Sequence, residues 1–389
     1  MTERTRWRHR VAGLGLIVLL ALLPELQISI PGVLPGPTWT AGSLQLMALC
    51  LLVGALALTY DVLFGLTGLL SFGHALYFAV GVYLFAIALQ KWHLTILPAA
   101  LLALAVATVL AIVVGAISLR VTGISFAMVT LTFAQAGSVL AYQNPGGLTG
   151  GEEGLGLGSA HLPGSLVGVV NTRNLYWLAL ATLVVVYALV AWLSRSRAGH
   201  LMAAVRENDI RVQVLGVRPY AVRLIAFVVS GVLAAAVGIA YLLLQGGASP
   251  QVTTPNFTLS LLVMVVLGGA GARWGAVLGG VVYTLLDQRL GVLASSHAIA
   301  SLPAVLRVPL SQPLFILGIL FILVVLFLPG GIAGATHRLQ DRTSQFRAVA
   351  ADRRADAGPR HPPRGDNPAQ QPDSAPRPHS PHPSSRIDS

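Results

Sequence analysis

The chain has 389 residues, of which 55% are hydrophobic and only 10% are charged, and its mean hydropathy is +0.74. Soluble domains carry roughly a quarter charged residues, so this composition excludes an ordinary soluble protein. Apolar runs of about 20 residues recur along the chain and predict an all-α polytopic integral membrane protein. The formal net charge of +11 does not indicate nucleic-acid binding, because the arginines stand at the ends of apolar runs and in the C-terminal tail. The single cysteine, Cys50, excludes an internal disulfide.

The first apolar run, residues 11–23, follows four arginines in residues 4–10. A proline and a glutamate come after it, where a signal peptide would carry a small-residue cleavage site. We therefore interpret the run as an uncleaved first span with the N-terminus inside. The Pro/Gly-rich segment 31–37 is then an external loop, and the second span covers Gly42–Thr59.

The next segment, Tyr60–Tyr83, is rich in glycine and carries two ionisable residues, Asp61 and His74. Small residues let helix backbones approach closely, which favours tight helix packing. The same glycines also fit a broken or re-entrant helix beside a substrate path, because irregular backbone at membrane depth needs protein or water around it. A third span then ends near Leu89, with Lys91 outside.

The fourth and fifth spans cover Leu97–Leu119 and Ile124–Tyr142, with Arg120 inside between them. Polar side chains on the fifth span predict hydrogen bonds between helices, with the lining of a pathway as the alternative. These residues are Ser125, Thr130, Thr132 and Gln135. The candidate substrate path consists of Gly65, Gly68, Ser71, His74, Thr130 and Gln135.

A long external loop, Gln143–Asn174, follows the fifth span. Its Gly-x-Gly-x-Gly run at 154–158 does not predict a nucleotide site, because no strand precedes it and no βαβ unit surrounds it. The sixth span, Leu175–Leu193, returns the chain to the inside.

A polar, amphipathic segment, Gly199–Val217, follows the sixth span and reads as one helix. Its apolar stripe consists of Leu201, Val205, Val212 and Leu215. Its other side offers two ion pairs at helical spacing, Glu207 with Arg211 and Arg206 with Asp209. The surrounding arginines place the segment on the cytoplasmic side. Such a helix either docks on a soluble partner or lies on the lipid surface.

The seventh span, Tyr220–Leu244, ends at an external loop over residues 245–256. Two short spans, Phe257–Leu267 and Ala276–Leu286, flank a tight inner turn that holds Arg273. An amphiphilic outer segment over 287–312 precedes the tenth span, Pro313–Leu328. We therefore predict about ten crossings, or about eight if the two short spans do not cross, with both termini cytoplasmic.

The composition changes at about residue 336 to arginine, proline, histidine, serine, aspartate and alanine. No apolar periodicity remains, so residues 336–389 are predicted to be a disordered, basic cytoplasmic tail after a transmembrane domain over 1–335. The tail is either an inert extension or a segment that regulates the protein or contacts lipid.

Several kinds of site are missing from the sequence. Lys91 is the only lysine and lies in no Walker A loop, so the chain is not a P-loop ATPase. The sequence has no His-Glu-x-x-His, no Cys/His cluster and no Gly-x-Ser-x-Gly, so we expect neither an enzyme nor a metal site, and no cofactor. The isolated carboxylates Asp61, Asp287 and Glu25 give little support to an ion-driven carrier. A passive pore or a permease driven by a partner remains.

Four stretches resemble the branched-chain amino acid permeases of bacterial ATP-binding-cassette importers, in particular their LivM-type subunit. They come in the family's order and are Gly65–Tyr83, Leu148–Leu155, Ala198–Phe227 and Val265–Gly279. The resemblance implies a multi-pass protein of the bacterial cytoplasmic (inner) membrane. It also implies four kinds of partner: a second permease, two ATPase subunits that hydrolyse the ATP, an extracytoplasmic solute-binding protein, and membrane lipid.

The segment 199–217 matches the family's coupling region, which docks on an ATPase subunit and passes its movement to spans six and seven. The residues implied for docking are Arg206, Glu207, Asn208, Asp209, Arg211 and Gly216, the last as the helix C-cap. Urea or short amides are the closest alternative substrates. An ion-coupled secondary carrier stays open and would need Asp61 and His74 in contact, and a membrane scaffold without transport is the third alternative.

Overall fold

The computed structural model describes residues 15, 18–26, 35–158, 171–294, 312–327 and 330–334. The chain separates into two units, Met1–Leu339 and Gln340–Ser389, and all described residues belong to the first unit. The start of the expected first span and the whole expected tail fall outside the described residues. The protein is described below through its first unit alone.

Five described helices are long and apolar enough to cross a membrane. They agree within three residues at either end with the expected spans two, four, five, six and seven. These helices are α2 (Ala41–Asp61), α4 (Ile96–Ser118), α5 (Ile124–Gln143), α6 (Thr172–Arg195) and α9 (Pro219–Gln245). The chain is therefore a multi-pass membrane protein.

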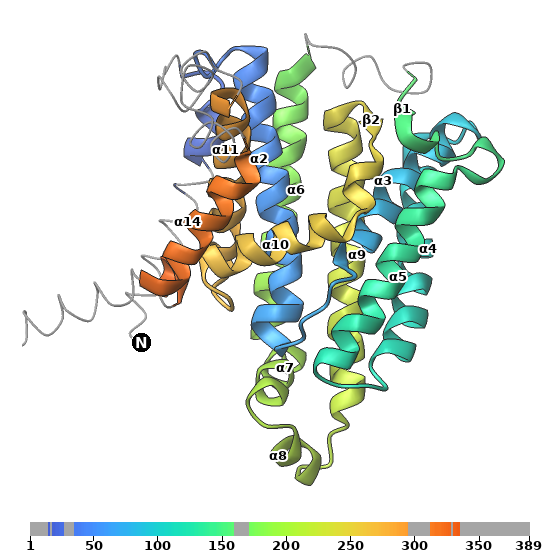
Figure 1. The fold of residues 1–389 in the computed structure, drawn as a ribbon, viewed down its shortest axis with the longest axis vertical. Coiled ribbons are helices and arrows are strands. Elements are labelled where there is room, and N and C mark those ends of the chain that lie inside the picture. The colour runs from blue at the N-terminus through green and yellow to red at the C-terminus, as the bar shows by residue number, and fades with distance from the viewer. Residues whose placement is uncertain are drawn as a thin grey trace, which may run out of the picture. The chain divides into compact units, whose positions relative to one another are not determined.

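Helix α2 is the centre of the bundle, and α6, α9 and α11 (Arg273–Ala294) pack around it (Figure 1). A helix that is apolar on all sides belongs in the interior, and nearly all of α2 beyond its first turns is buried. Small residues let α11 come close, because a Cβ added at Gly280 would lie 2.7 Å from the Gly54 Cα.

The helix break predicted between Tyr60 and Tyr83 is present. After α2 the chain forms a short π-helix, η1 (Val62–Leu66), then a non-helical link over 67–73, and then α3 (His74–Gln90). The link reverses the direction of the chain and runs back alongside α2 before α3 begins (Figure 1). The packing interpretation also holds, because α3 lies so close to α9 that a Cβ at Gly81 would collide with the Ala235 carbonyl oxygen.

The short eighth span is α10 (Pro255–Gly268), which lies across the upright helices instead of along them (Figure 1). Fourteen residues give a helix of about 21 Å, which is shorter than a hydrocarbon core of about 30 Å. Helix α11 is longer than the expected ninth span, so the predicted outer segment over 287–312 begins as the last turns of that helix. Helix α14 (Pro313–Phe327) matches the tenth expected span.

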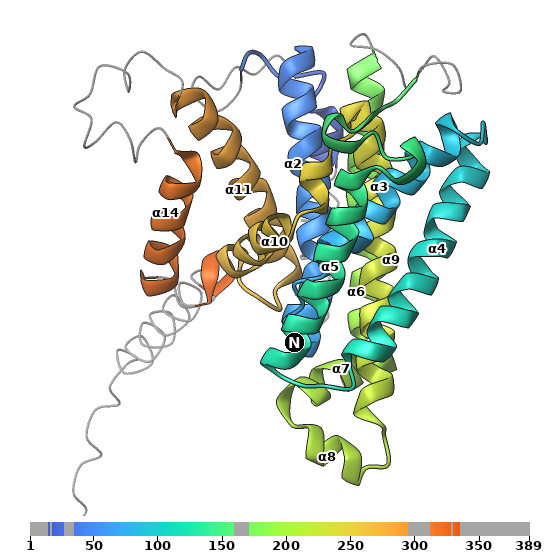
Figure 2. The same ribbon diagram turned by 45° about the vertical axis from the view of Figure 1, so that its right-hand side comes forward.

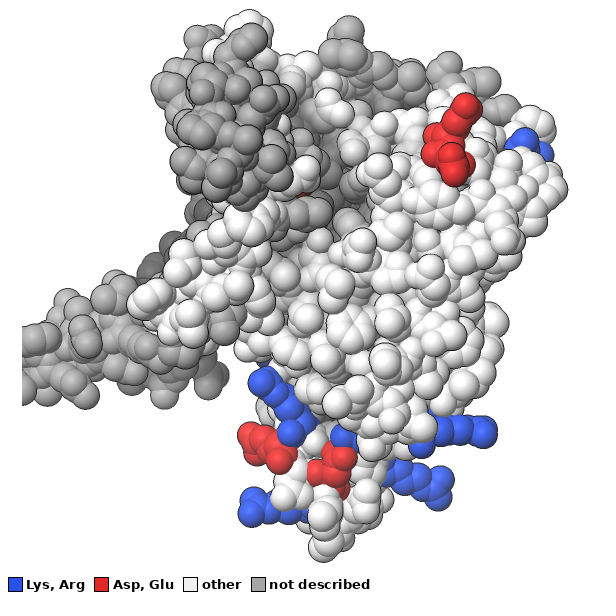
Figure 3. Space-filling view, in the orientation of Figure 1, with Lys and Arg blue, Asp and Glu red and all other residues white. Residues whose placement is uncertain are grey.

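The loop after α5 is partly ordered at one end of the bundle. Its elements are η2 (Pro145–Gly147), η3 (Gly151–Glu153) and β1 (Leu155–Gly156), and β1 pairs antiparallel with β2 (Gly247–Ala248) after α9. A 3-10 turn, η7 (Pro250–Thr253), then leads into α10. The other end of the bundle carries α7 (Arg197–Glu207) and α8 (Asp209–Val214), visible in Figure 2 below the other helices. Charged side chains gather around α7 and α8, a second, smaller charged group lies at the opposite end, and the described surface between them is nearly free of charge (Figure 3).

Candidate functional site

The segment 199–217 forms two helices, so the prediction of one continuous amphipathic helix was wrong. The backbone of Asn208 is extended, with φ −162° and ψ 107°, and ends α7. Its side chain then accepts a hydrogen bond from the Arg211 N–H at 3.0 Å and caps α8. Asparagine is a strong N-cap residue because its short side chain reaches the free amides of the next turn.

Only part of the predicted apolar stripe is buried. Val205 and Val212 are 2% and 3% exposed and face the bundle. Leu215, however, is 80% exposed, and two other apolar side chains of the same short helix, Ile210 and Val214, are 72% and 82% exposed. Helix α8 therefore presents an apolar tip, defined by Ile210, Val214 and Leu215, at the polar end of the bundle.

Neither of the two expected ion pairs forms in the described structure, and two of the four residues have other partners. Asp209 pairs with Arg223 of α9, with 2.5 Å between Oδ2 and Nη2. Arg206 donates to a backbone carbonyl in another segment, as described below. Exposed side chains at helical spacing gain little from pairing with each other, so contacts to neighbouring elements decide their arrangement.

Gly216 ends α8 in the left-handed conformation, with φ +79°. Its N–H donates to the Gln213 carbonyl at 2.9 Å, and the Val217 N–H donates to the Val212 carbonyl at 3.3 Å. These two bonds form a Schellman motif, which satisfies carbonyls at a helix end and favours glycine. The expected helix end at Gly216 is confirmed.

Arg206 is an exposed residue of α7, but the end of its side chain reaches the segment that follows α2. Its Nη1 donates to the carbonyl oxygen of Gly65 in η1. The stem of the side chain lies against Gly68, where an added Cβ would come within 3.1 Å of the Arg206 Cγ. Gly271, in the turn between α10 and α11, forms the third wall, since a Cβ there would lie 3.3 Å from the Arg206 Nη1. We call this space, lined by Gly65, Gly68 and Gly271, the glycine slot.

Asp61 and His74 have different partners, so the contact that would have favoured an ion-coupled carrier is absent from the described structure. Oδ1 of Asp61 accepts from the Gly271 N–H at 2.8 Å. Nε2 of His74 lies 2.9 Å from the Thr59 hydroxyl. Within the part of the chain that the structure describes, no group of three or more His, Cys, Asp or Glu could hold a metal ion.

The residues of the candidate substrate path lie in three places. Gly65 and Gly68 line the glycine slot. Ser71, His74 and Thr130 are buried where the link before α3 meets α5, and the Phe72 N–H donates to the Thr130 hydroxyl at 3.1 Å. Gln135 lines an open cavity of about 840 Å³ between α5 and the start of α10.

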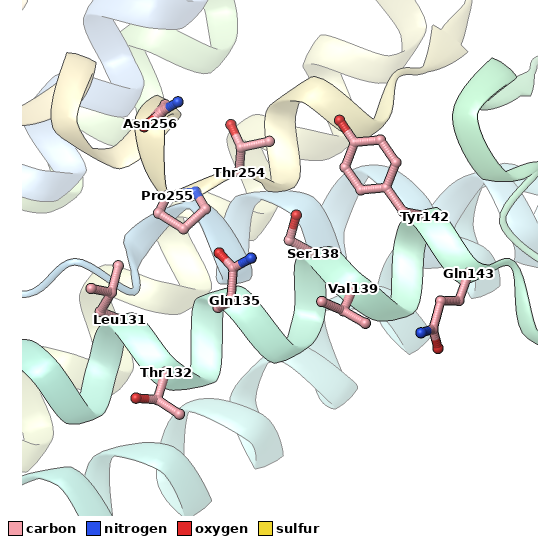
Figure 4. Close-up of a pocket in the computed structure, with 10 residues that line it drawn as sticks. All are labelled: Leu131, Thr132, Gln135, Ser138, Val139, Tyr142, Gln143, Thr254, Pro255 and Asn256. Atoms are coloured by element: carbon pink, nitrogen blue, oxygen red, sulfur yellow. The ribbon is translucent and has the colours of Figure 1, made fainter.

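Most of the residues that line this cavity carry polar, uncharged side chains, beside the apolar Leu131, Val139 and Pro255. In Figure 4, Gln135, Ser138 and Tyr142 of α5 point toward the segment that carries Thr254 and Pro255. Thr132, Gln143 and Asn256 also line the cavity. Its volume lies within the range of small-molecule sites. Polar residues at 135, 138 and 142 share one helix face, and this spacing could have identified Ser138 and Tyr142 as lining residues from the sequence. No pattern in the sequence identifies the lining residues at the start of α10.

The sequence is similar to two kinds of bacterial permease. It is 29% identical over 269 residues to the high-affinity branched-chain amino acid transport system permease protein LivM of Salmonella typhimurium strain LT2. That match covers 62% of this chain and 61% of LivM, and LivM of Escherichia coli strain K12 gives the same values. The autoinducer 2 import system permease protein LsrC of Escherichia coli O9:H4 strain HS is 30% identical over 151 residues, which are 37% of this chain and 40% of LsrC. No solved structure gives a significant match.

The match to LivM spans about three fifths of that relative's length, 61%. The family model described as "Branched-chain amino acid transport system / permease component" matches residues 42–325, from the first turn of α2 to the end of α14. With most of its length covered by that model, the chain belongs to the family of branched-chain amino acid transport system permease components.

Proposed function

We propose that the chain is the transmembrane permease subunit of an ATP-binding-cassette importer for branched-chain amino acids in a bacterial cytoplasmic membrane. Membership of the permease family supports the class of protein. The substrate class is supported by the similarity to two LivM proteins, which are named as permeases of a high-affinity branched-chain amino acid transport system. In this assembly the chain works with a second permease, two ATPase subunits and an extracytoplasmic solute-binding protein, and the ATP is bound and hydrolysed by the ATPase subunits.

The observation that carries the proposal is the apolar tip of α8, at the end of the bundle where the charged side chains gather. Three large apolar side chains that are each more than 70% exposed, Ile210, Val214 and Leu215, are costly in water. The exposed Glu207 and Arg211 lie beside them, around a shallow groove of about 270 Å³. An apolar centre with a charged rim is the usual composition of a protein–protein interface. We assign this surface to an ATPase subunit.

The substrate site of the proposed importer is the cavity between α5 and α10. A branched-chain amino acid is a zwitterion with no net charge, so its site needs no excess fixed charge, and hydroxyl and amide groups can hydrogen-bond both its ammonium and its carboxylate. Gln135, Ser138 and Asn256 offer both donors and acceptors there. Gln135 is exposed on α5 within a membrane span. A polar side chain without hydrogen-bond partners is energetically unfavourable in the hydrocarbon core of the membrane. A water-filled path or a second permease packed on this face would satisfy it.

The test is co-purification of the ATPase subunits with this chain from membranes. V214S/L215S should lower ATPase recovery at least tenfold, because each buried apolar side chain contributes about 1.5–3 kcal/mol. Leu148→Ser, a matched loss of an apolar side chain at the opposite end of the bundle, should leave recovery unchanged. Failure of the unaltered chain to recover any ATPase would contradict the proposed function. Equal recovery with V214S/L215S would contradict the docking surface alone.

Urea or a short amide is the second candidate substrate, and the amide side chains of Gln135, Gln143 and Asn256 in the cavity favour it. The two substrates are separated by uptake of labelled L-leucine in the presence of excess urea or acetamide. Undiminished leucine uptake supports the branched-chain substrate. Urea uptake that leucine does not inhibit would favour the alternative.

A further inference from the structure

We propose that Arg206 is the residue that transmits movement of α7 to the substrate cavity, by engaging the glycine slot. This inference rests on the proposed function, because the movement comes from a docked ATPase. It differs from the expected route through α6 and α9, which are the two long helices that flank α7 and α8 along the chain. The glycine slot connects α7 to three other parts of the bundle: η1, the link over 67–73 and the α10–α11 turn.

The position of the guanidinium group follows from backbone electrostatics. Gly65 belongs to the π-helical end of α2, where carbonyl groups lose their helical partners. A helix C-terminus carries a partial negative charge, so a cation there is favourable. The buried carboxylate of Asp61 lies one turn earlier and accepts the Gly271 N–H, which brings the α10–α11 turn to the same place. Arg206 thus contacts a site of negative potential at the end of α2, where the α10–α11 turn is also bonded.

The three glycines are required by this geometry. A side chain at Gly65 would collide with Asp61 and with the Gly271 backbone, so η1 and the α10–α11 turn could not meet. Gly68 and Gly271 have φ of +72° and +87°, which other residues rarely adopt. A side chain on either would also crowd the space that the arginine occupies. The slot is therefore shaped for one long cationic side chain that enters from α7.

Hydrogen bonds continue from the slot to the cavity. Gly68 lies four residues before Phe72, whose N–H donates to the Thr130 hydroxyl on α5 at 3.1 Å. The Ala75 N–H, in the first turn of α3, donates to the Thr258 hydroxyl on α10 at 3.0 Å. Helices α5 and α10 are the two that line the 840 Å³ cavity. A shift of α7 that moves Arg206 thus displaces the link over 67–73, which is bonded to α5, and with it the first turn of α3, which is bonded to α10.

The experiment uses the complete importer reconstituted in proteoliposomes, with L-leucine as the transported probe. R206A should still recover the ATPase subunits and hydrolyse ATP, while leucine taken up per ATP hydrolysed falls at least tenfold. R206K, which keeps a long cation, should restore part of the ratio. R197A removes the same charge from the exposed start of α7 and should match the unaltered protein.

Two results would overturn the proposal. One is an R206A importer whose uptake per ATP equals that of R197A. The other is loss of the ATPase subunits from R206A, which would make Arg206 a docking contact. Should R206A fail to reach the membrane, R206Q keeps a hydrogen-bond donor without the charge, and it carries the same expectation of a lowered ratio. If the unaltered importer shows no ATP-driven leucine uptake, the proposed function fails instead, and the two failures are distinguishable.

Discussion

Asp209 at the start of α8 and Arg223 in the second turn of α9 form an ion pair, with 2.5 Å between Oδ2 and Nη2. The pair ties the helix that carries the apolar tip to a long membrane helix. Both side chains are only partly exposed, at 36% and 21%, so solvent screens the interaction without removing it. The tip is thereby held at a defined position relative to α9.

Breaking this pair should weaken ATPase binding through the position of α8. D209N and R223Q should each lower the affinity for the ATPase subunit about three- to fivefold, which corresponds to roughly 0.7–1 kcal/mol. The double variant should be little worse than either single one, because both remove the same interaction. Affinity is measured by titration of the purified ATPase onto the solubilised permease, with R197Q as the charge-matched control for R223Q. Additive losses would mean that the two residues act separately.

The close approach of α3 and α9 should make Gly81 intolerant of any side chain. Its added Cβ would collide with the Ala235 carbonyl oxygen, and forced overpacking of this kind costs about 1–3 kcal/mol. G81A should therefore lower the midpoint of thermal unfolding in detergent by several degrees. G318A makes the same change in α14 at a position with no heavy atom within 4 Å. It should leave the midpoint equal or slightly raised, since alanine favours a helix. An unchanged midpoint for G81A would mean that the two helices separate easily.

Loss of Gln135 should affect substrate affinity and leave assembly intact. Q135A removes a hydrogen-bonding group from the cavity, and one such bond contributes about 1–1.5 kcal/mol. The KM for leucine uptake should rise roughly tenfold with unchanged recovery of the ATPase subunits. M128A is the control, because Met128 is 59% exposed on α5 and does not line the cavity. An unchanged KM would place the substrate elsewhere.

The orientation of the chain in the membrane is open to a direct measurement. In a C50A background, single cysteines at Lys91 or Gly247 should react with an impermeant thiol reagent applied from outside. A cysteine at Glu207 should react only after permeabilisation, because the charged end of the bundle is expected in the cytoplasm. External labelling at Glu207 would invert the topology and remove the docking surface from the side where ATP is hydrolysed.

The long helices could be predicted from the sequence because their signals are local. An apolar run of about 20 residues is sufficient to define α4 or α9, and glycine, proline and arginine mark their ends. The left-handed Gly216 was predictable for the same reason, since the helix end needs only neighbouring backbone groups. Family membership likewise follows from the order of residues along the chain.

Contacts between distant segments decided the rest. Nothing local to Arg206 indicates that it leaves the polar face of α7 for a carbonyl 141 residues earlier in the chain. The apparent continuous helix over 199–217 divides at Asn208 because that side chain caps α8, and Asp209 takes a partner from α9 instead of from its own helix. The cavity depends on α10 lying across the bundle, which brings Asn256 to the same cavity as Gln135. Hydrophobic periodicity in the sequence indicates which helices are buried. Which polar groups form hydrogen bonds with each other depends on the packed structure, because carbonyl groups at helix ends and the space left by glycines come together only there.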